Sequence, residues 1–354
     1  MAISRMGPST VMCVLWVLSG LLGVILSKGL FGVWFWLEWG FAGAICLVSG
    51  VSLEENEGAM KYFIFQSLGS MLIFFSFVMI SCGGLLSIWS GGVSGFVGIL
   101  IKLGMFPFHF WVPSVMGLIS WKSCFLIGWM QKVGPLYVLS NFGISSSMYG
   151  FLEVSAFLTS VVGALGGMGI LPYRVLIGYS SLVHSGWLVV VCLCSSVFLY
   201  VYLFVYGIVF FFAVSVLSEK KLFSFLDHCN MYDNSKQGAW ENEMSKIGVL
   251  IHLSSLSGMP PFLGGTLKML SVYVLWQKFP FSCLILVMCS IISFYFYLSL
   301  IMNCLVSIGT SSSGNFISKE GRSFWSGMSS GDLLILVVQM WGGMGLVYLL
   351  GFLT

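Results

Sequence analysis

Charged side chains stand inside several long apolar stretches of this sequence, where an ionised group is costly. Lys102 lies in GFVGILIKLGMFPFHFWVP, Lys132 in GWMQKVGPLYV, Lys268 in FLGGTLKMLSVY and Glu38 in VWFWLEWGFAG. Each such charge costs about 2.5 to 3.5 kcal/mol at the centre of a membrane helix. Together they cost on the order of 10 kcal/mol, so we expect these side chains to have a function rather than to be decorative.

The balance of signs among these residues suggests proton transfer. One carboxylate cannot neutralise three amines, so at least two lysines lack an acid partner in this chain unless Glu153 turns inward. An amine in a medium of low dielectric constant can exist as the neutral base as well as the ammonium ion, and such a group can take up and release a proton. His184, in GYSSLVHSGW beside Tyr179, Ser180 and Ser181, adds an imidazole that can pass a proton between its two nitrogens. The pattern therefore predicts a proton relay formed by the buried lysines and His184.

Simpler interpretations of the same residue types stay open. An ion pair that locks two helices together would account for an inner charge, and His184 could equally bond to a neighbouring helix. Glu153 is expected to start a span, where an acid favours the helix N-terminus. His109 and His252 lie beside proline-containing breaks and are more simply structural. Snorkelling accounts for the lysines at the ends of apolar stretches, which are Lys28, Lys61 and Lys278.

The elements that must position these side chains are membrane helices. Of the 354 residues, 58% are apolar and only 8% are charged, and the mean hydropathy is +1.01, whereas soluble domains carry about 25% charged residues. We therefore expect an all-α integral membrane protein with about 11 transmembrane helices, since a span takes about twenty residues. The apolar stretches lie near 8–27, 30–51, 60–82, 93–116, 118–142, 151–171, 175–195, 197–218, 245–277, 280–306 and 332–353.

Prolines interrupt the fourth and ninth of these stretches, at MFPF (105–108) and at GMPPFLGG (258–265). The two breaks are five stretches apart, and an odd number of helices per unit inserts the second copy upside down. Inverted repeats with broken helices at matching positions are a design of transporters. We therefore expect a first inverted repeat over 1–150, a second over 151–310, and a loop with a last transmembrane helix over 311–354.

Positive charges between the stretches are strongly asymmetric. If the helices alternate in direction, the side opposite the N-terminus collects only Lys28 and Lys278. The positive-inside rule then places the N-terminus on the cytoplasmic or matrix side. The charges on the N-terminal side are Arg5, Lys61, Lys122, Arg174, Lys220, Lys221, Lys236, Lys246, Lys319 and Arg322.

The chain carries no motif for a redox cofactor or a nucleotide. It has no G-x-x-x-x-G-K-[ST], no G-x-G-x-x-G opening a helix after a strand, no four-cysteine cluster and no H-E-x-x-H. Most of its 10 cysteines lie within or beside apolar stretches, where a thiol behaves as a small hydrophobe. We expect no cofactor and no metal ion in this chain, so that any redox chemistry takes place elsewhere.

Four blocks of the sequence resemble a known family. KLGMFPFHFWVP, WMQKVGPLY, YSSLVHSGW and LSSLSGMPPFLGGTLK have the order and spacing of the subunit 2 group within the antiporter-like proton-channel family of respiratory complex I. The blocks run from about residue 100 to about residue 270, and the number of expected helices is similar to that of the shortened animal form.

The resemblance implies roles for the inner charges. Glu38 and Lys102 resemble the acid and lysine pair of the first half-channel, and Lys132 resembles the central lysine. Lys268 resembles the terminal lysine near the outlet, and His184 the histidine on the hydrated path between the two.

The resemblance also implies a location and partners. It implies the mitochondrial inner membrane, with the N-terminus in the matrix, and contacts with lipids and with other membrane-arm subunits, among them subunit 4 and subunit 4L, but none with nucleic acid. It further implies that NADH, FMN, iron–sulfur clusters and ubiquinone are bound by other subunits of the complex, whose electron transfer drives the protons.

Two other functions would use the same residues. A stand-alone or Mrp-like cation/proton antiporter would need the same lysines, and only dependence on partner subunits separates it from a complex I subunit. A membrane scaffold held by buried ion pairs would leave transport unchanged when Lys132 is neutralised.

Overall fold

The computed structural model describes residues 7–141, 146–219, 239–260, 262–312, 337–345 and 348, and within these ranges the regular structure is helical. The expected all-α class is therefore confirmed for the described part of the chain. The helices are α1 (Pro8–Leu26), α2 (Leu30–Val48), α3 (Leu53–Ser81), α4 (Leu85–Leu103), α5 (Trp111–Leu118), α6 (Trp121–Phe125), α7 (Gln131–Asn141), α8 (Ser146–Gly166), α9 (Tyr173–Cys194), α10 (Ser196–Glu219), α12 (Ala239–Ser257), α13 (Leu263–Trp276) and α14 (Pro280–Ser312).

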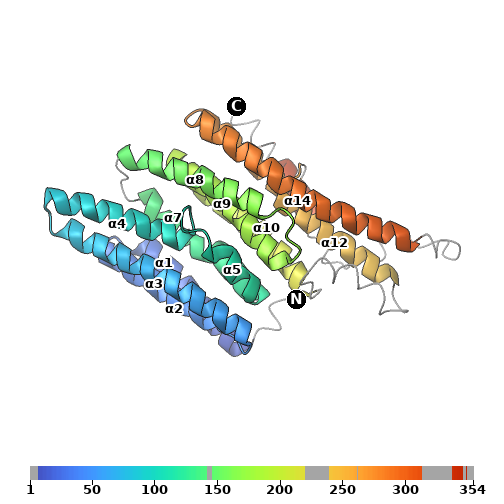
Figure 1. Cartoon of the computed structure of the whole chain (residues 1–354), viewed down its shortest axis with the longest axis horizontal. Coiled ribbons are helices and arrows are strands. Elements are labelled where there is room, and N and C mark those ends of the chain that lie inside the picture. Colours follow the sequence, from blue (N-terminus) through green and yellow to red (C-terminus); the bar gives the residue numbers. More distant parts are fainter. Residues whose placement is uncertain are drawn as a thin grey trace.

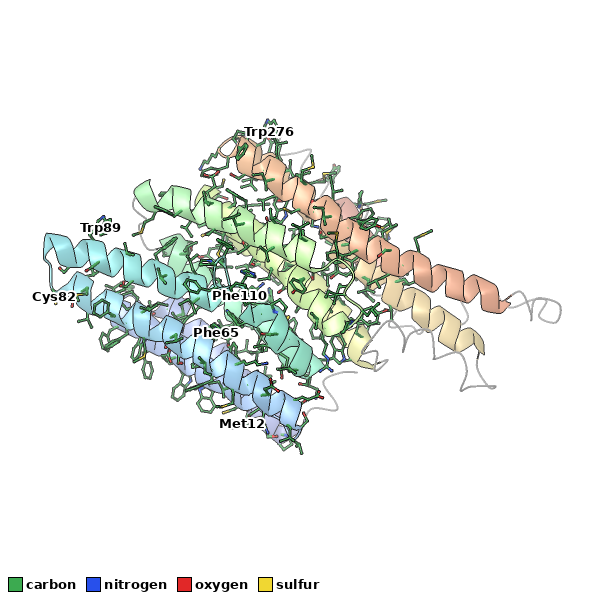
Figure 2. All side chains as sticks on the ribbon, in the orientation of Figure 1. Met12, Phe65, Cys82, Trp89, Phe110 and Trp276 are labelled. Atoms are coloured by element: carbon green, nitrogen blue, oxygen red, sulfur yellow. The ribbon has the colours of Figure 1, made fainter. Side chains whose placement is uncertain are left out.

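Seven of the helices in the described ranges are long and apolar enough to cross a bilayer. Large apolar side chains also point away from the bundle, as Figure 2 shows for Met12, Trp89 and Trp276, which are 68%, 71% and 54% exposed. A soluble protein would bury such residues, whereas lipid accepts them. The protein is a multi-pass membrane protein.

The helices run side by side, and α9 occupies the middle of the bundle (Figure 1). The first helices pack in succession, α1 on α2, α2 on α3 and α3 on α4, while α12 and α14 lie on the other side of α8 to α10. Helix α9 contacts α5, α7, α8, α10, α13 and α14, and most of its residues are buried. A helix that is enclosed on all sides can carry polar side chains away from lipid.

Both predicted breaks are present. Helix α4 ends at Leu103, and Gly104 takes a left-handed conformation with φ of 68° before the chain turns into α5. Helix α12 ends at Ser257, and Gly258, with φ of 90°, begins the turn into α13. Glycine adopts positive φ without the Cβ clash that other residues meet. The inverted relation between the two halves stays a prediction, and the last predicted span lies mostly outside the described residues.

Two boundaries differ from the expectation. Helix α3 starts at Leu53 rather than near 60, because the Ser52 side chain caps it by accepting from the Glu55 backbone N–H at 3.2 Å. The stretch near 118–142 is not one regular helix, since a π-helical turn over Leu126–Met130 separates α6 from α7. Such turns insert one extra residue per turn and are frequent at functional sites.

Candidate functional site

Lys102 and Glu38 form the ion pair that the resemblance implied. Lys102 lies in the last turn of α4, and its Nζ donates to Glu38 Oε1 of α2 at 3.1 Å. The lysine side chain is 3% exposed and the glutamate side chain 27%. The Phe41 ring, on the same helix as Glu38, lies 5.9 Å from Nζ. The ammonium group is therefore enclosed, while its acid partner keeps contact with the surroundings.

Neutral side chains hold the backbone around Lys102. The last carbonyls of a helix have no partner within the helix, and here two of them are taken from outside. The Lys102 carbonyl accepts from Gln66 Nε2 of α3 at 3.2 Å, and the Ile101 carbonyl accepts from Trp111 Nε1 of α5 at 3.1 Å. These bonds fix the end of α4 at the break and leave the Lys102 amine to face Glu38.

Lys132 reaches the centre of the bundle. It lies on α7 just after the π-helical turn, it is 4% exposed, and its Nζ donates to the Ser181 carbonyl of α9 at 2.6 Å. No ion pair joins it to any carboxylate that the structure describes. The neighbouring Gln131 donates from Nε2 to the Gly40 carbonyl of α2 at 3.3 Å. The start of α7 is thus tied to both α2 and α9.

Lys268 crosses the second break. It lies on α13, is 8% exposed, and donates from Nζ to the carbonyl of Ser257, the last residue of α12, at 2.8 Å. The side chain passes over Gly258, where a Cβ would lie 2.8 to 2.9 Å from the Cδ, Cε and Nζ atoms of the lysine. Any residue larger than glycine at position 258 would displace the Lys268 amine.

His184 lies in the interior near both Lys132 and Lys268. It lies on α9 and is 4% exposed, and the charges of both Lys132 and Lys268 act on its ring. Its Nδ1 is 3.1 Å from the Tyr202 hydroxyl of α10, and the Tyr206 ring stacks on it with centroids 4.4 Å apart. The imidazole is therefore held between α9 and α10 by the Tyr202 hydroxyl and the Tyr206 ring.

These residues form a row through the interior of the bundle. It begins at Glu38 and Lys102 between α2 and α4, continues to Lys132 between α7 and α9, and ends at Lys268 between α12 and α13, with His184 before the end. Helix α4 packs on α7, and α9 packs on both α7 and α13. Amines and an imidazole in such a row can exchange protons through short local movements or ordered water.

Glu153 does not join the row. It lies within α8, which starts at Ser146, so the expectation that it starts a span is wrong. The Ser282 hydroxyl of α14 donates to its carboxylate. The acid therefore links α8 to α14 and leaves the inner lysines without it.

The remaining candidates take structural positions. His109 lies in the first break with its ring 4.1 Å from that of Phe110, and His252 Nδ1 is 3.0 Å from Gln339 Nε2. Lys61 pairs with Glu57 on an exposed face at 2.6 Å, and Lys278 donates to the Cys194 carbonyl. The described residues include no cluster of three or more histidine, cysteine or acidic groups that could hold a metal ion.

Sequence reasoning missed Tyr202 and Gln66, which contact the row directly. Both leave a signal, since each is a polar group in an otherwise apolar stretch: YVYLFVY contains Tyr200, Tyr202 and Tyr206, and Gln66 is the amide of FIFQSLGS. The carbonyls of Ser181 and Ser257, which accept from Lys132 and Lys268, leave no signal in the sequence, because every residue carries a carbonyl.

Comparison with known proteins places this geometry in context. The family model described as NADH:quinone oxidoreductase/Mrp antiporter, TM, matches residues 27–296. A protein of Lumbricus terrestris named NADH-ubiquinone oxidoreductase chain 2 is 32% identical over 71% of this chain and 73% of its own. The protein of that name in Mytilus edulis is 32% identical over 91% and 92%. In respiratory complex I from Thermus thermophilus, one chain is 20% identical and has the same fold, with a TM-score of 0.76 over 97% of this chain and 80% of that one.

Proposed function

Since the chain belongs to the NADH:quinone oxidoreductase/Mrp antiporter transmembrane family, we propose that it is a proton-translocating membrane-arm subunit of an NADH:ubiquinone oxidoreductase. Its relatives carry the name NADH-ubiquinone oxidoreductase chain 2. The proposal extends to the mitochondrial inner membrane, to an N-terminus in the matrix, and to neighbouring membrane-arm subunits, among them subunit 4 and subunit 4L.

The observation that carries the proposal is the buried row of amines with one partly exposed acid at its end. Lys102, Lys132 and Lys268 are each less than 9% exposed, and the one carboxylate paired with a buried lysine in the described part of the chain is Glu38. A scaffold would need an acid for each amine to offset the cost of burial. A row of amines held by carbonyls suits groups that gain and lose protons.

Movement of Glu38 would drive the first transfer. With the carboxylate 3.1 Å from Nζ, attraction favours the ammonium form of Lys102. When Glu38 withdraws, the buried charge loses its compensation and the neutral amine is favoured, so a proton leaves towards Lys132. The reverse movement draws a new proton to Lys102. Protons then pass by way of His184 to Lys268.

Pumping needs energy from outside this chain. Moving one charge through a membrane potential takes about 2.3 kcal/mol per 100 mV. We propose that the source is electron transfer from NADH to ubiquinone in other subunits, which would bind the NADH, FMN, iron–sulfur clusters and ubiquinone. The contribution of this chain is the proton path alone.

A second candidate function is a stand-alone or Mrp-like cation/proton antiporter. The family model spans both classes of protein, and the same row would serve either. An antiporter would exchange a cation for the proton and would not need an electron-transfer arm.

A native gel separates the two functions. Membranes are extracted in mild detergent, and the gel is stained for NADH oxidation and probed with an antibody against this chain. We expect the chain only in a band of several hundred kilodaltons or more that oxidises NADH. If it runs in a small complex without that activity, and cation gradients drive proton flux in vesicles that contain it, the antiporter function is correct.

A further inference from the structure

Trp129 lies inside the π-helical turn, three positions before Lys132, and the two side chains bind different helices. The Trp129 indole Nε1 donates to the Leu203 carbonyl of α10 at 2.7 Å. Lys132 Nζ donates to the Ser181 carbonyl of α9 at 2.6 Å. Helix α10 packs on the π-helical turn, and α7 packs on α9. One short stretch of chain is therefore tied to both of the helices that hold His184.

The Leu203 carbonyl is open to the indole because residue 207 is a glycine. In an α-helix such as α10 a carbonyl accepts from the N–H four positions later, and its oxygen has a second lone pair. A helical side chain leans towards the N-terminus and covers the preceding turn, but Gly207 has no side chain. A Cβ at Gly207 would lie 2.5 Å from Trp129 Nε1. The indole therefore needs this glycine to reach the carbonyl.

The same arrangement occurs in reverse on the other side of this contact. Gly128, in the π-helical turn, lies against the ring of Phe210 of α10, and a Cβ at Gly128 would lie 2.5 Å from Phe210 Cζ. The Phe210 side chain is fully buried. Each element thus provides a glycine for an aromatic ring of the other. Close packing of this kind fixes how α10 sits against the turn, because neither side has room to shift inward.

These contacts close a ring through α7 with its π-helical turn, α9 and α10. Ser181 and His184 are three positions apart on α9, so they lie on one face of it. His184 Nδ1 is 3.1 Å from the Tyr202 hydroxyl, and Tyr202 directly precedes Leu203 on α10. In order, the ring joins Trp129, Lys132, Ser181, His184, Tyr202 and Leu203. The spacing between the lysine and the imidazole therefore depends on the bond that the indole makes.

We propose that Trp129 is a positioning residue that clamps α10 and so keeps Lys132 and His184 at the spacing that proton transfer needs. The role in transport rests on the proposed function. The indole does not relay protons itself, since its N–H is a donor only. Without its bond, α10 can move away from the π-helical turn, and Tyr202 moves with it. The imidazole then follows its hydroxyl partner, and transfer slows because it requires short and aligned contacts.

Trp129→Phe tests the proposal, with Trp34→Phe as the matched control. Trp34 Nε1 of α2 donates to the Ser70 carbonyl of α3 at 3.2 Å, so each substitution keeps an aromatic ring and removes one indole donor to a neighbouring helix. Only the Trp129 bond belongs to the ring of contacts around Lys132. The intact complex is reconstituted into liposomes, and the NADH-driven proton flux per assembled complex is measured in H₂O and in D₂O. A slower proton transfer raises the ratio of these two rates, whereas a loss of packing alone does not.

We expect similar small losses of thermal stability in the two variants, because each loses one hydrogen bond. Proton flux should fall about five-fold in Trp129→Phe, the factor that corresponds to one hydrogen bond, and the ratio of the rates in H₂O and D₂O should rise. Flux and ratio should both stay unchanged in Trp34→Phe. Unchanged flux in Trp129→Phe, a lower flux with an unchanged ratio, or equal effects in the two variants would overturn the proposal. Failure of Trp129→Phe alone to assemble would also overturn it, because the indole would then be structural.

Gly207→Ala gives an independent test that keeps the indole. The added methyl group pushes the Trp129 ring off the Leu203 carbonyl, so we expect the same fall in flux and the same rise in the rate ratio. The effects of Trp129→Phe and Gly207→Ala should not add in the double variant, because both remove one bond. Additive effects would contradict a shared bond. Failure of the proposed function would show separately, as absence of proton pumping by the unsubstituted complex.

Discussion

The two broken helices place a lysine in different surroundings. At the first break, Lys102 precedes the interruption and faces the carboxylate of Glu38. At the second, Lys268 follows the interruption and faces the Ser257 carbonyl. A carboxylate is a full charge on a side chain that can move, whereas a carbonyl is a dipole fixed in the backbone. The first break is therefore suited to switching, and the second to holding and passing on a proton.

The backbone at each break completes the difference. The carbonyls at the end of α4 are taken by the neutral side chains of Gln66 and Trp111, so they offer nothing to a lysine. At the end of α12, by contrast, the Ser257 carbonyl accepts from Lys268. The carbonyls at the end of α4 are therefore not available to a lysine, whereas one at the end of α12 binds Lys268.

Removal of the acid should have the largest effect. Glu38→Gln leaves Lys102 buried without a compensating charge, and breaking a buried pair in this way costs about 3 to 5 kcal/mol. We expect reduced assembly on native gels, and loss of most NADH-driven pumping in the complex that remains. Glu57→Gln is the control, since its partner Lys61 is exposed and a surface pair contributes about 0 to 1 kcal/mol. Equal losses of assembly and pumping in Glu38→Gln and Glu57→Gln would contradict this account, because the pair at the first break would then matter no more than a surface pair.

Removal of the second lysine should cost less stability. Lys268→Met leaves the Ser257 carbonyl without its donor, a loss of about 1 to 3 kcal/mol. We expect a smaller fall in the thermal stability of the isolated complex than for Glu38→Gln, together with loss of pumping. A larger loss of thermal stability in Lys268→Met than in Glu38→Gln would contradict this account. It would mean that Lys268 has a charged partner whose loss is costly.

The two glycines at the breaks offer a matched pair. Alanine at Gly104 or at Gly258 must adopt positive φ, at about 1 to 2 kcal/mol in either case. Their neighbours differ, since a Cβ at Gly104 meets Val112 and one at Gly258 meets Lys268. We expect the larger loss of thermal stability for Gly104→Ala, whose Cβ would lie 2.4 Å from Val112 Cγ2, but a fall in pumping rate only for Gly258→Ala. A fall of equal size in Gly104→Ala would show that strain alone slows transport.

The smallest effect is expected at Gln66. Gln66→Leu removes the donor to the Lys102 carbonyl, worth about 0.5 to 1.5 kcal/mol, and leaves the Glu38 pair intact. Thermal stability should fall slightly while protons pumped per NADH stay unchanged. Abolished pumping in a stable complex would mean that Gln66 takes part in the transfer.

The course of the helices could be predicted because each signal is local. Apolar stretches and prolines located the long apolar helices of the described residues and both interruptions. The early start of α3 could also have been predicted from the sequence, since Ser52 and Glu55 form a capping sequence in VSLEEN. The π-helical turn at Leu126–Met130 has no such signal, because it depends on how α6 and α7 pack against their neighbours.

The charged members of the site could be predicted from their cost in a membrane, but their partners could not. Lys132 bonds to a carbonyl 49 positions away and Lys268 to one 11 positions away. Backbone acceptors carry no residue identity, so only the three-dimensional packing reveals them. The pairing of Glu38 with Lys102 was within reach because both partners are side chains of unusual type for their surroundings.

Proton flux after Lys132→Met tests the central claim most directly. The complex is reconstituted into liposomes and the protons moved per NADH oxidised are measured, with Lys122→Met as the control, because Lys122 is exposed at the start of α6. The account predicts that Lys122→Met pumps as the unsubstituted complex does and that Lys132→Met does not. Normal proton flux in Lys132→Met would contradict it, and the buried lysines would then be a scaffold.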